Sequence, residues 1–241
     1  MPYPLKAIGD NYVFLDPDDD CNAAALALEE YAYSEDFCIA WSFNSNFIAR
    51  LMAAGFLVMS ELISLPEENP APGETVREIP VLLPRHHLIR SCLFFHDLHI
   101  KKSIVSKLSH YELHFDTDFD LILKKCLKIH GKGWLTDALV KAIRKIKSKV
   151  APEAKPVSFS LYREGKLKAG EFGVIVNRVY TSYSGYFEEK NAGTVQMILT
   201  AKYLEKNGFS FWDLGMPLDY KLTLGAKEIS RKEFMDYFFS E

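Results

Sequence analysis

The chain has 241 residues, of which 48% are hydrophobic and 25% are charged, with a formal net charge of −3. These proportions are typical of a globular protein, and no apolar run reaches the ~18 residues of a membrane-spanning helix. The first residues lack the apolar core of a signal peptide, so we expect a cytoplasmic protein without a membrane partner. The four cysteines are far apart and form no CxxC pair, which predicts neither a disulfide nor a zinc site.

Charge is unevenly distributed along the chain. Residues 1–80 contain 14 acidic and 3 basic residues, whereas residues 101–155 contain 13 basic and 6 acidic residues. The basic segment has apolar residues at helical spacing, which leave a face rich in lysine: Leu139, Val140, Ile143 and Ile146. This face is either a solvated helix surface or a contact for a phosphate backbone, which needs positive charge without base recognition.

Residues 1–96 predict a small α+β domain. An aspartate or asparagine precedes each of two apolar helical patterns and is expected to cap the helix. The expected helices are 22–33 and 46–54, and the expected strands are 37–41, 56–65, 77–83 and 87–95.

Residues 97–241 predict a second domain, with a mixed, mainly antiparallel sheet flanked by helices. Three strands in succession, joined by turns at 164–165 and 177–178, lead into a long helix, a short strand and a terminal helix. The expected strands are 111–116, 157–163, 166–176, 179–183 and 209–213. The expected helices are 99–108, 117–129, 136–149, 191–207 and 231–239.

Short motifs in this second domain follow one another at a spacing close to that of one protein family. They are Leu98–Ser103, Gly133–Thr136, Gly170–Gly173, Asn191–Ala192 and Leu224–Arg231. Through them, residues 97–238 resemble the leucyl/phenylalanyl-tRNA–protein transferase family, whose catalytic domain has a GNAT-like fold. The chain is identified as a divergent member, because several positions between the motifs differ from the family.

The resemblance implies an activity and two partners. Family members take leucine or phenylalanine from a charged tRNA and join it to the N-terminal amine of a protein, which marks that protein for degradation. Aminoacyl-tRNA and a protein or peptide N-terminus are therefore the expected partners, and no cofactor is expected. Because the aminoacyl ester is already activated and the amine has a reference pKa near ~8, positioning and an oxyanion donor would supply most of the acceleration.

Asp213 and Tyr183 are the catalytic candidates that the resemblance provides. Asp213 would act as a base or orient the amine; alternatively, it bonds turn amides at the end of its strand. Tyr183 stands where the family has an acidic residue, and would donate its hydroxyl to the oxyanion or simply pack as an inward aromatic. The family's catalytic glutamine is Gly215 in this chain.

The expected substrate-binding residues form a more polar set than the family's apolar aminoacyl pocket. Trp134 would stack on the terminal adenine of the tRNA or pack at a helix entry, and Ser184 and Asn191 would hold the aminoacyl ester or cap the helix. Glu171 would favour a cationic or polar aminoacyl group, unless it is a strand residue turned to solvent. The pocket positions are Glu171, Gly185, Thr200 and Trp212, and Gly215 is a further expected substrate-binding residue.

The lysine-rich segment supplies the expected contacts to the tRNA acceptor stem: Lys101, Lys102, Lys141, Arg144 and Lys145. The scattered histidines show no ligand pattern, so no metal is expected. Three alternatives remain open. They are an enzyme of altered amino-acid specificity, a catalytically inactive member that binds protein N-termini or RNA, and a GNAT-type N-acyltransferase. The sequence lacks the acyl-CoA pyrophosphate loop that the last alternative requires.

Overall fold

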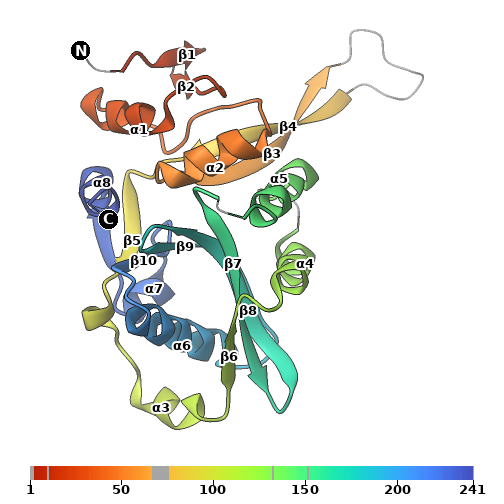
Figure 1. Cartoon of the computed structure of the whole chain (residues 1–241), viewed down its shortest axis with the longest axis vertical. Coiled ribbons are helices and arrows are strands. Elements are labelled where there is room, and N and C mark those ends of the chain that lie inside the picture. Colours follow the sequence, from red (N-terminus) through yellow and green to blue (C-terminus); the bar gives the residue numbers. More distant parts are fainter. Residues whose placement is uncertain (1–2, 10, 67–75, 132, 151, 241) are drawn as a thin grey trace. The chain divides into compact units, whose positions relative to one another are not determined.

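The computed structural model describes residues 3–9, 11–66, 76–131, 133–150 and 152–240 (Figure 1). The chain divides into two compact units, Met1–His86 with His130–Ser148, and His87–Ile129 with Lys149–Glu241. The first unit is thus discontinuous in sequence, since it includes a helix from the lysine-rich segment. The domain boundary after residue 96 stays a prediction, and the compact units themselves divide after His86.

The first unit combines helices with two antiparallel strand pairs. Its elements are β1 (Lys6–Ile8), β2 (Tyr12–Phe14), α1 (Cys21–Glu30), α2 (Ser45–Ala53), β3 (Leu57–Pro66), β4 (Val76–Arg85) and α5 (Asp137–Lys147). The side chains of Asp20 and Asn44 cap α1 and α2 as predicted, each accepting two backbone hydrogen bonds. The apolar face of α5 is buried, and α5 packs against α2.

The predicted strand at 37–41 is wrong. This segment forms only isolated bridges, which join Phe37 to Arg85, Ile39 to Phe14, and Ala40 to Leu82. The segment therefore divides its hydrogen bonds between β2 and β4, and a continuous ladder with either strand does not form.

The second unit is built on a seven-stranded sheet of order β11-β5-β10-β9-β8-β7-β6. Every neighbouring pair is antiparallel except β9 and β10, which are parallel. Its strands are β5 (Ile89–Leu93), β6 (Glu112–Phe115), β7 (Lys155–Arg163), β8 (Lys166–Val176), β9 (Val179–Phe187), β10 (Phe211–Asp213) and β11 (Lys227–Ser230). Its helices are η1 (Phe95–Asp97), α3 (Lys102–Leu108), α4 (Phe119–His130), α6 (Ala192–Lys206), α7 (Asp219–Thr223) and α8 (Arg231–Phe238). The predicted α+β class with a mixed, mainly antiparallel sheet is confirmed.

Turn chemistry explains why the β7-β8-β9 meander was predictable. Glu164 and Gly165 have φ of 51° and 69°, and Asn177 has φ of 49°, values that glycine and asparagine tolerate best. Both predicted hairpin turns are confirmed. Strands β1, β2 and β11 and helix α7 were not predicted, because each is only 3 to 5 residues long and shows no clear periodicity.

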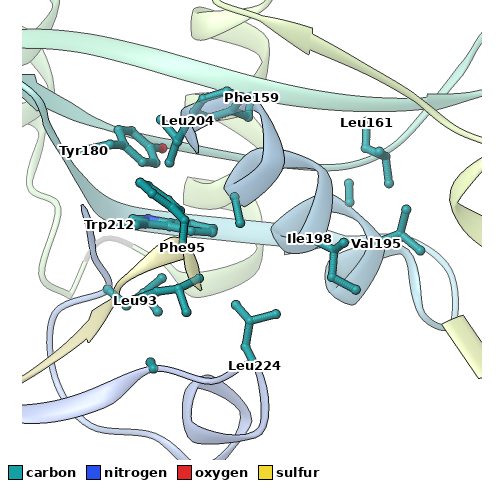
Figure 2. Close-up of a cluster of buried hydrophobic side chains, with 14 of the residues drawn as sticks. Leu93, Phe95, Phe159, Leu161, Tyr180, Val195, Ile198, Leu204, Trp212 and Leu224 are labelled. Carbon is teal, nitrogen blue, oxygen red and sulfur yellow. The ribbon is translucent and has the colours of Figure 1, made fainter. Parts of the chain in front are cut away.

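Helix α6 covers one face of this sheet and contacts β7, β8, β9 and β10. Figure 2 shows Val195, Ile198 and Leu204 of α6 in one apolar cluster with Tyr180 and Trp212 of the sheet. The Tyr180 and Trp212 ring centroids are 5.9 Å apart. Each fully buried apolar side chain of this size stabilises the fold by roughly 1.5–3 kcal/mol, which fixes α6 over β9 and β10.

Candidate functional site

The parallel strands β9 and β10 separate where β10 ends. They pair at three positions, the last of which joins Asp213 to Thr181. Beyond Asp213 the chain stays with β5, because Leu214 N donates to Ser91 O at 2.9 Å and Ser91 N donates to Gly215 O at 2.7 Å. Strand β9 instead continues with β8 as far as Phe187. The residues after Thr181 and after Asp213 therefore line the two sides of a strand separation.

On one face of the sheet, the Asp213 carboxylate forms a buried ion pair. Its Oδ2 atom lies 3.2 Å from Arg90 Nη1, and the two side chains are 0% and 1% exposed. Thr181 Oγ1 donates to the same oxygen at 3.0 Å, and Gly215 N donates to Oδ1 at 2.9 Å. The Arg90 guanidinium also lies 4.0 Å from the centroid of the Phe234 ring in α8. Both carboxylate oxygens are thus engaged, as a buried carboxylate requires.

The turn after β10 has a backbone conformation suited to glycine. Gly215 has φ of 73°, in the left-handed region. The hydrogen bond from its amide to Asp213 closes this turn. A residue with a Cβ would occupy this conformation at a cost of roughly 1–2 kcal/mol. The glycine that stands in place of the family's glutamine is therefore matched to the local backbone.

On the opposite face, which α6 covers, Glu171 is at the centre of a polar cluster. The carboxylate is 6% exposed, and its Oε2 atom accepts from Ser182 Oγ at 3.3 Å. Trp212 Nε1 donates to the same serine oxygen at 2.8 Å. Gln196 Nε2 donates to Thr200 Oγ1 at 2.9 Å, which aligns two buried polar residues of α6. Glu171 is therefore turned into the molecule, so the alternative of a solvent-facing strand residue is wrong.

Gly185 pairs with Glu171 across β8 and β9. A Cβ at Gly185 would come within 3.2 Å of the Glu171 Cβ and 3.3 Å of Gly170 O, so the close approach of the two strands favours glycine here. Ser182 and Gly185 are half-buried. The structure thus brings Glu171, Gly185, Thr200 and Trp212 to one face of the sheet; their role in an aminoacyl pocket stays a prediction.

Burial shifts the ionisation of two groups near the strand separation. It raises the pKa of Glu171 to about 7, a rise that is moderated by the nearby polar groups of Tyr180, Gln196 and Ser182 and by the charge of Lys221. Burial also lowers the pKa of Lys221 to about 8, although the charges of Asp213 and Glu171 act in the opposite direction. The Lys221 ammonium donates to Leu214 O and Met216 O, both at 2.6 Å.

Tyr183 occupies a bulge in β9. Phe172 pairs with Ser184 and Gly173 pairs with Ser182, so Tyr183 is the additional residue between them. Its ring centroid lies 6.0 Å from that of Phe172, which packs in turn on Phe119 of α4. Phe172 and Glu171 are consecutive strand residues and point to opposite faces. Tyr183 is therefore not on the face of Glu171.

Ser184 and Asn191 are placed by backbone interactions. Ser184 is half-buried, and its carbonyl accepts from Cys126 Sγ of α4 at 3.5 Å. Asn191 is at the N-cap position of α6 with φ of 70°, and its side chain makes no capping hydrogen bond to the described residues. Asn191 is therefore at the expected cap position, but its side chain does not cap the described helix amides.

Trp134 belongs to the first compact unit. Its carbonyl accepts from Ser60 N of β3 at 2.9 Å, and its side chain is half-buried. The predicted stacking on an adenine stays a prediction.

The predicted tRNA-binding residues are all exposed and lie on two helices. Lys101 and Lys102 are at the start of α3 in the second unit. Lys141, Arg144 and Lys145 are on α5 in the first unit, on the face opposite the buried apolar residues. The lysine-rich face is therefore present as an exposed surface of α5.

The described residues show neither a metal-binding cluster nor a membrane-spanning helix. Among the described residues, no group of three or more His, Cys, Asp or Glu side chains could hold a metal ion. The cysteines are buried and unbridged: Cys21, Cys38, Cys92 and Cys126. Within the part of the chain that the structure describes, no helix has the length and apolar character needed to span a bilayer.

Sequence reasoning missed several polar residues of these two clusters. Arg90 carried a signal, since it is a lone charge in a predicted apolar strand. Gln196 could have been found from its spacing of four residues to Thr200 on one helix, and Tyr180 and Ser182 from their alternation along β9. Lys221 carried no such signal in the sequence, because α7 is a single short turn of helix with no periodic pattern.

The chain is similar in sequence to known proteins of one family. The model of the family "Leucyl/phenylalanyl-tRNA protein transferase" matches residues 92–238, more than half of the chain. A leucyl/phenylalanyl-tRNA–protein transferase from Pseudomonas entomophila (strain L48) is 30% identical over 153 residues, which cover 61% of this chain and 66% of that protein. The corresponding protein of Campylobacter lari is 27% identical over 146 residues, with the same coverage. The chain belongs to the leucyl/phenylalanyl-tRNA–protein transferase family.

Solved structures give a weaker likeness. The C-terminal domain of a putative lysylphosphatidylglycerol synthetase from Agrobacterium fabrum has a TM-score of 0.42 at 11% identity, covering 90% of this chain and 68% of that one. A GCN5-related N-acetyltransferase from Kribbella flavida has a TM-score of 0.39 at 13% identity, covering 92% and 76%. These scores are too low to carry an argument about fold or function.

Proposed function

We propose that this protein transfers an aminoacyl group from a charged tRNA to the N-terminal amine of a protein or peptide. The observation that carries the proposal is the family match, which extends over every strand that borders the separation of β9 and β10. It also includes the basic helices α3 and α5. The expected cytoplasmic location, the absence of a cofactor and the tagging of proteins for degradation are part of the proposal.

The chemistry proposed is an aminolysis of an ester. The amine nitrogen attacks the ester carbonyl, a peptide C–N bond forms, the ester C–O bond breaks, and the proton of the amine ends on the released ribose hydroxyl. Because a free N-terminal amine has a reference pKa of about 8, a useful fraction is neutral near pH 7 without a strong base. The main requirement is then a site that holds amine and ester together and donates to the oxyanion.

Within this proposal, Asp213 is a positioning residue. Its carboxylate is engaged by Arg90, Thr181 and the Gly215 amide, so it holds the strand separation in shape. Tyr183 remains a catalytic candidate, with its ring on the face of Phe172. A Tyr183→Phe variant tests that role: a hydroxyl that donates to the oxyanion predicts a fall in transfer rate of about 100-fold or more. An unchanged rate would assign Tyr183 to packing.

A second candidate function is a catalytically inactive module that binds protein N-termini or RNA. It is favoured by the full engagement of the Asp213 carboxylate and by the glycine at position 215. A transfer assay with the whole chain, a pool of charged tRNAs and peptides of varied N-terminus separates the two. Labelled peptide product with any pair supports the enzyme. Binding of tRNA or peptide without product, across the whole pool, would contradict it.

The role of α5 in tRNA binding has its own test. Single Lys141→Gln and Lys145→Gln variants should weaken tRNA binding, because each removes one positive charge that would neutralise a phosphate. Each removal should reduce the slope of log K against log salt by about 0.7–0.9. Lys206→Gln is the matched control, an exposed lysine at the end of α6. Unchanged affinity and slope in both α5 variants would exclude this face as the tRNA-binding surface.

A further inference from the structure

Glu171 leaves one buried oxygen without a hydrogen bond. Oε2 accepts from Ser182, whereas Oε1 has no hydrogen-bond partner among the residues that the structure describes. Tyr180 and Gln196 lie near enough to affect the ionisation of the carboxyl group, but neither reaches hydrogen-bonding geometry with Oε1. An unpaired polar atom at this depth costs about 1–3 kcal/mol, and more when it is charged.

Three donors around Glu171 are committed to other acceptors. The Trp212 indole donates to Ser182, and the Gln196 amide donates to Thr200. The Lys221 ammonium donates to two carbonyls of the loop that follows β10. The indole has no second N–H, and the further N–H groups of the amide and the ammonium form no hydrogen bond with Oε1.

The Tyr180 hydroxyl is the remaining donor nearby. Like Oε1 of Glu171, it has no hydrogen-bond partner among the described residues. A phenol is neutral, so even a hydrogen bond from Tyr180 would add no counter-charge, and the Lys221 charge acts on the carboxylate while the ammonium itself bonds to Leu214 O and Met216 O. The cluster thus keeps one carboxylate oxygen available for a cationic group from outside the chain.

The side of the cluster toward β9 is partly exposed. Ser182 and Gly185 are half-buried, and Gly185 faces Glu171 without a side chain. Strand β10 ends level with Thr181, so Ser182 is the first residue of β9 that lies beyond the strand pair. A group entering between the separated strands would meet Ser182 and Gly185 first and the glutamate behind them.

We propose that Glu171 receives a cationic aminoacyl side chain, of the lysyl or arginyl class, and is the specificity-determining residue of the transfer reaction. The inference rests on the proposed function, which makes the aminoacyl group the ligand of this site. A cation supplies both the missing donor and the charge that lets the carboxylate ionise inside the protein. A leucyl or phenylalanyl side chain would leave Oε1 unpaired. A site built to hydrogen-bond its ligand discriminates strongly against a ligand that lacks the donor, whereas an apolar pocket discriminates only weakly between side chains of different shape.

The test is a competition among lysyl-, arginyl-, leucyl- and phenylalanyl-tRNA at equal concentration, with one acceptor peptide. The wild-type protein should prefer a cationic donor by at least about 100-fold. Glu171→Gln keeps the shape and removes the charge, and should reduce that preference by about 10-fold or more. Glu171→Leu should favour the apolar donors. Glu205→Gln, an exposed glutamate of α6, is the matched control and should keep the wild-type order.

A binding measurement makes the test independent of turnover and of one variant's folding. Non-reactive amide analogues of the four aminoacyl-adenosines are titrated into the wild-type protein and Glu171→Gln, whose folding is checked by thermal unfolding. Tighter binding of the lysyl or arginyl analogue to the wild-type protein, lost in Glu171→Gln, supports the inference. Equal binding of all four analogues would overturn it.

The outcomes also distinguish the inference from the proposed function. Transfer of leucine or phenylalanine with an order that Glu171→Gln and Glu171→Leu leave unchanged would overturn the inference and support the function. A change confined to the KM of the acceptor peptide would assign Glu171 to the peptide amine instead and would also overturn the inference. If no donor is transferred by the wild-type protein, the proposed function fails, and the analogue binding alone decides whether Glu171 selects a cation.

Discussion

The two faces of the sheet near β9 and β10 each bury one carboxylate, and they treat it differently. Asp213 is 0% exposed, paired with Arg90, and hydrogen-bonded at both oxygens. Glu171 is 6% exposed, and one of its oxygens has no partner among the described residues. The first arrangement offsets the cost of burial within the protein. The second arrangement leaves part of the cost of burial uncompensated. Such uncompensated polar groups are found in sites that bind a ligand.

The largest effect is expected from breaking the paired carboxylate. Asp213→Asn leaves the Arg90 guanidinium buried without its counter-charge, and should lower the free energy of unfolding by about 3–5 kcal/mol. Urea unfolding monitored by circular dichroism measures the loss. Asp236→Asn is the control, since it breaks the exposed Lys232–Asp236 pair and should change stability far less. Equal small losses in both variants would contradict the difference between the faces.

Glu171, the unpaired carboxylate, should destabilise the folded protein at neutral pH. The pKa of Glu171 is raised from 4.5 to about 7 in the folded protein, so the folded state holds its proton more tightly than the unfolded state. The contribution of this group to stability is therefore present at low pH and is lost as pH rises through about 7. Between pH 5 and pH 8 the wild-type protein should lose about 2–3 kcal/mol more than Glu171→Gln does.

That pH dependence is measured by urea unfolding of both proteins at pH 5, 6, 7 and 8. Lys221, which faces the same cluster, is present in both proteins, so its own titration largely cancels in the difference. Parallel pH profiles for the wild-type protein and Glu171→Gln would show that the Glu171 carboxyl group is not strained by burial.

The smallest effect on stability is expected at Gly215, in the turn that follows β10. Gly215→Ala places a Cβ on a backbone with φ of 73°, and should destabilise the protein by roughly 1–2 kcal/mol. Gly133→Ala is the matched control, because a Cβ there would meet no atom within 4 Å. Thermal unfolding of the two variants compares them. A loss at Gly133 as large as that at Gly215 would show that conformational strain is not the cause.

The sequence was informative where local chemistry decides the structure. The hairpin turns at Glu164–Gly165 and Asn177, the caps at Asp20 and Asn44, and the mixed sheet could all be predicted from residue type and spacing. The isolated bridges of residues 37–41 could not be predicted, because their two partner strands lie far apart in sequence. The same limit applies to α5, whose periodicity predicted a helix but not that α2 would be its packing partner.

The candidate site was only partly accessible to the same reasoning. Glu171, Gly185, Thr200 and Trp212 come to one side of the sheet because strand alternation and helix spacing place them there. The bulge at Tyr183 shifts the alternation of β9 by one residue, and nothing in the neighbouring residues predicted it. The partners of Asp213 could not be predicted either, since Arg90 is separated from it by more than half of the chain.

The path of the chain between the compact units has a consequence for synthesis and for fragments. The first unit includes His130–Ser148, so a truncation after residue 96 would remove α5 and expose the surface of α2 that α5 covers. On the ribosome, this unit has all of its parts only after residue 148 has emerged, when α3 and α4 of the second unit have already been made. The first unit can therefore complete its fold only after part of the second has been synthesised, and the whole chain is the smallest sound choice for expression.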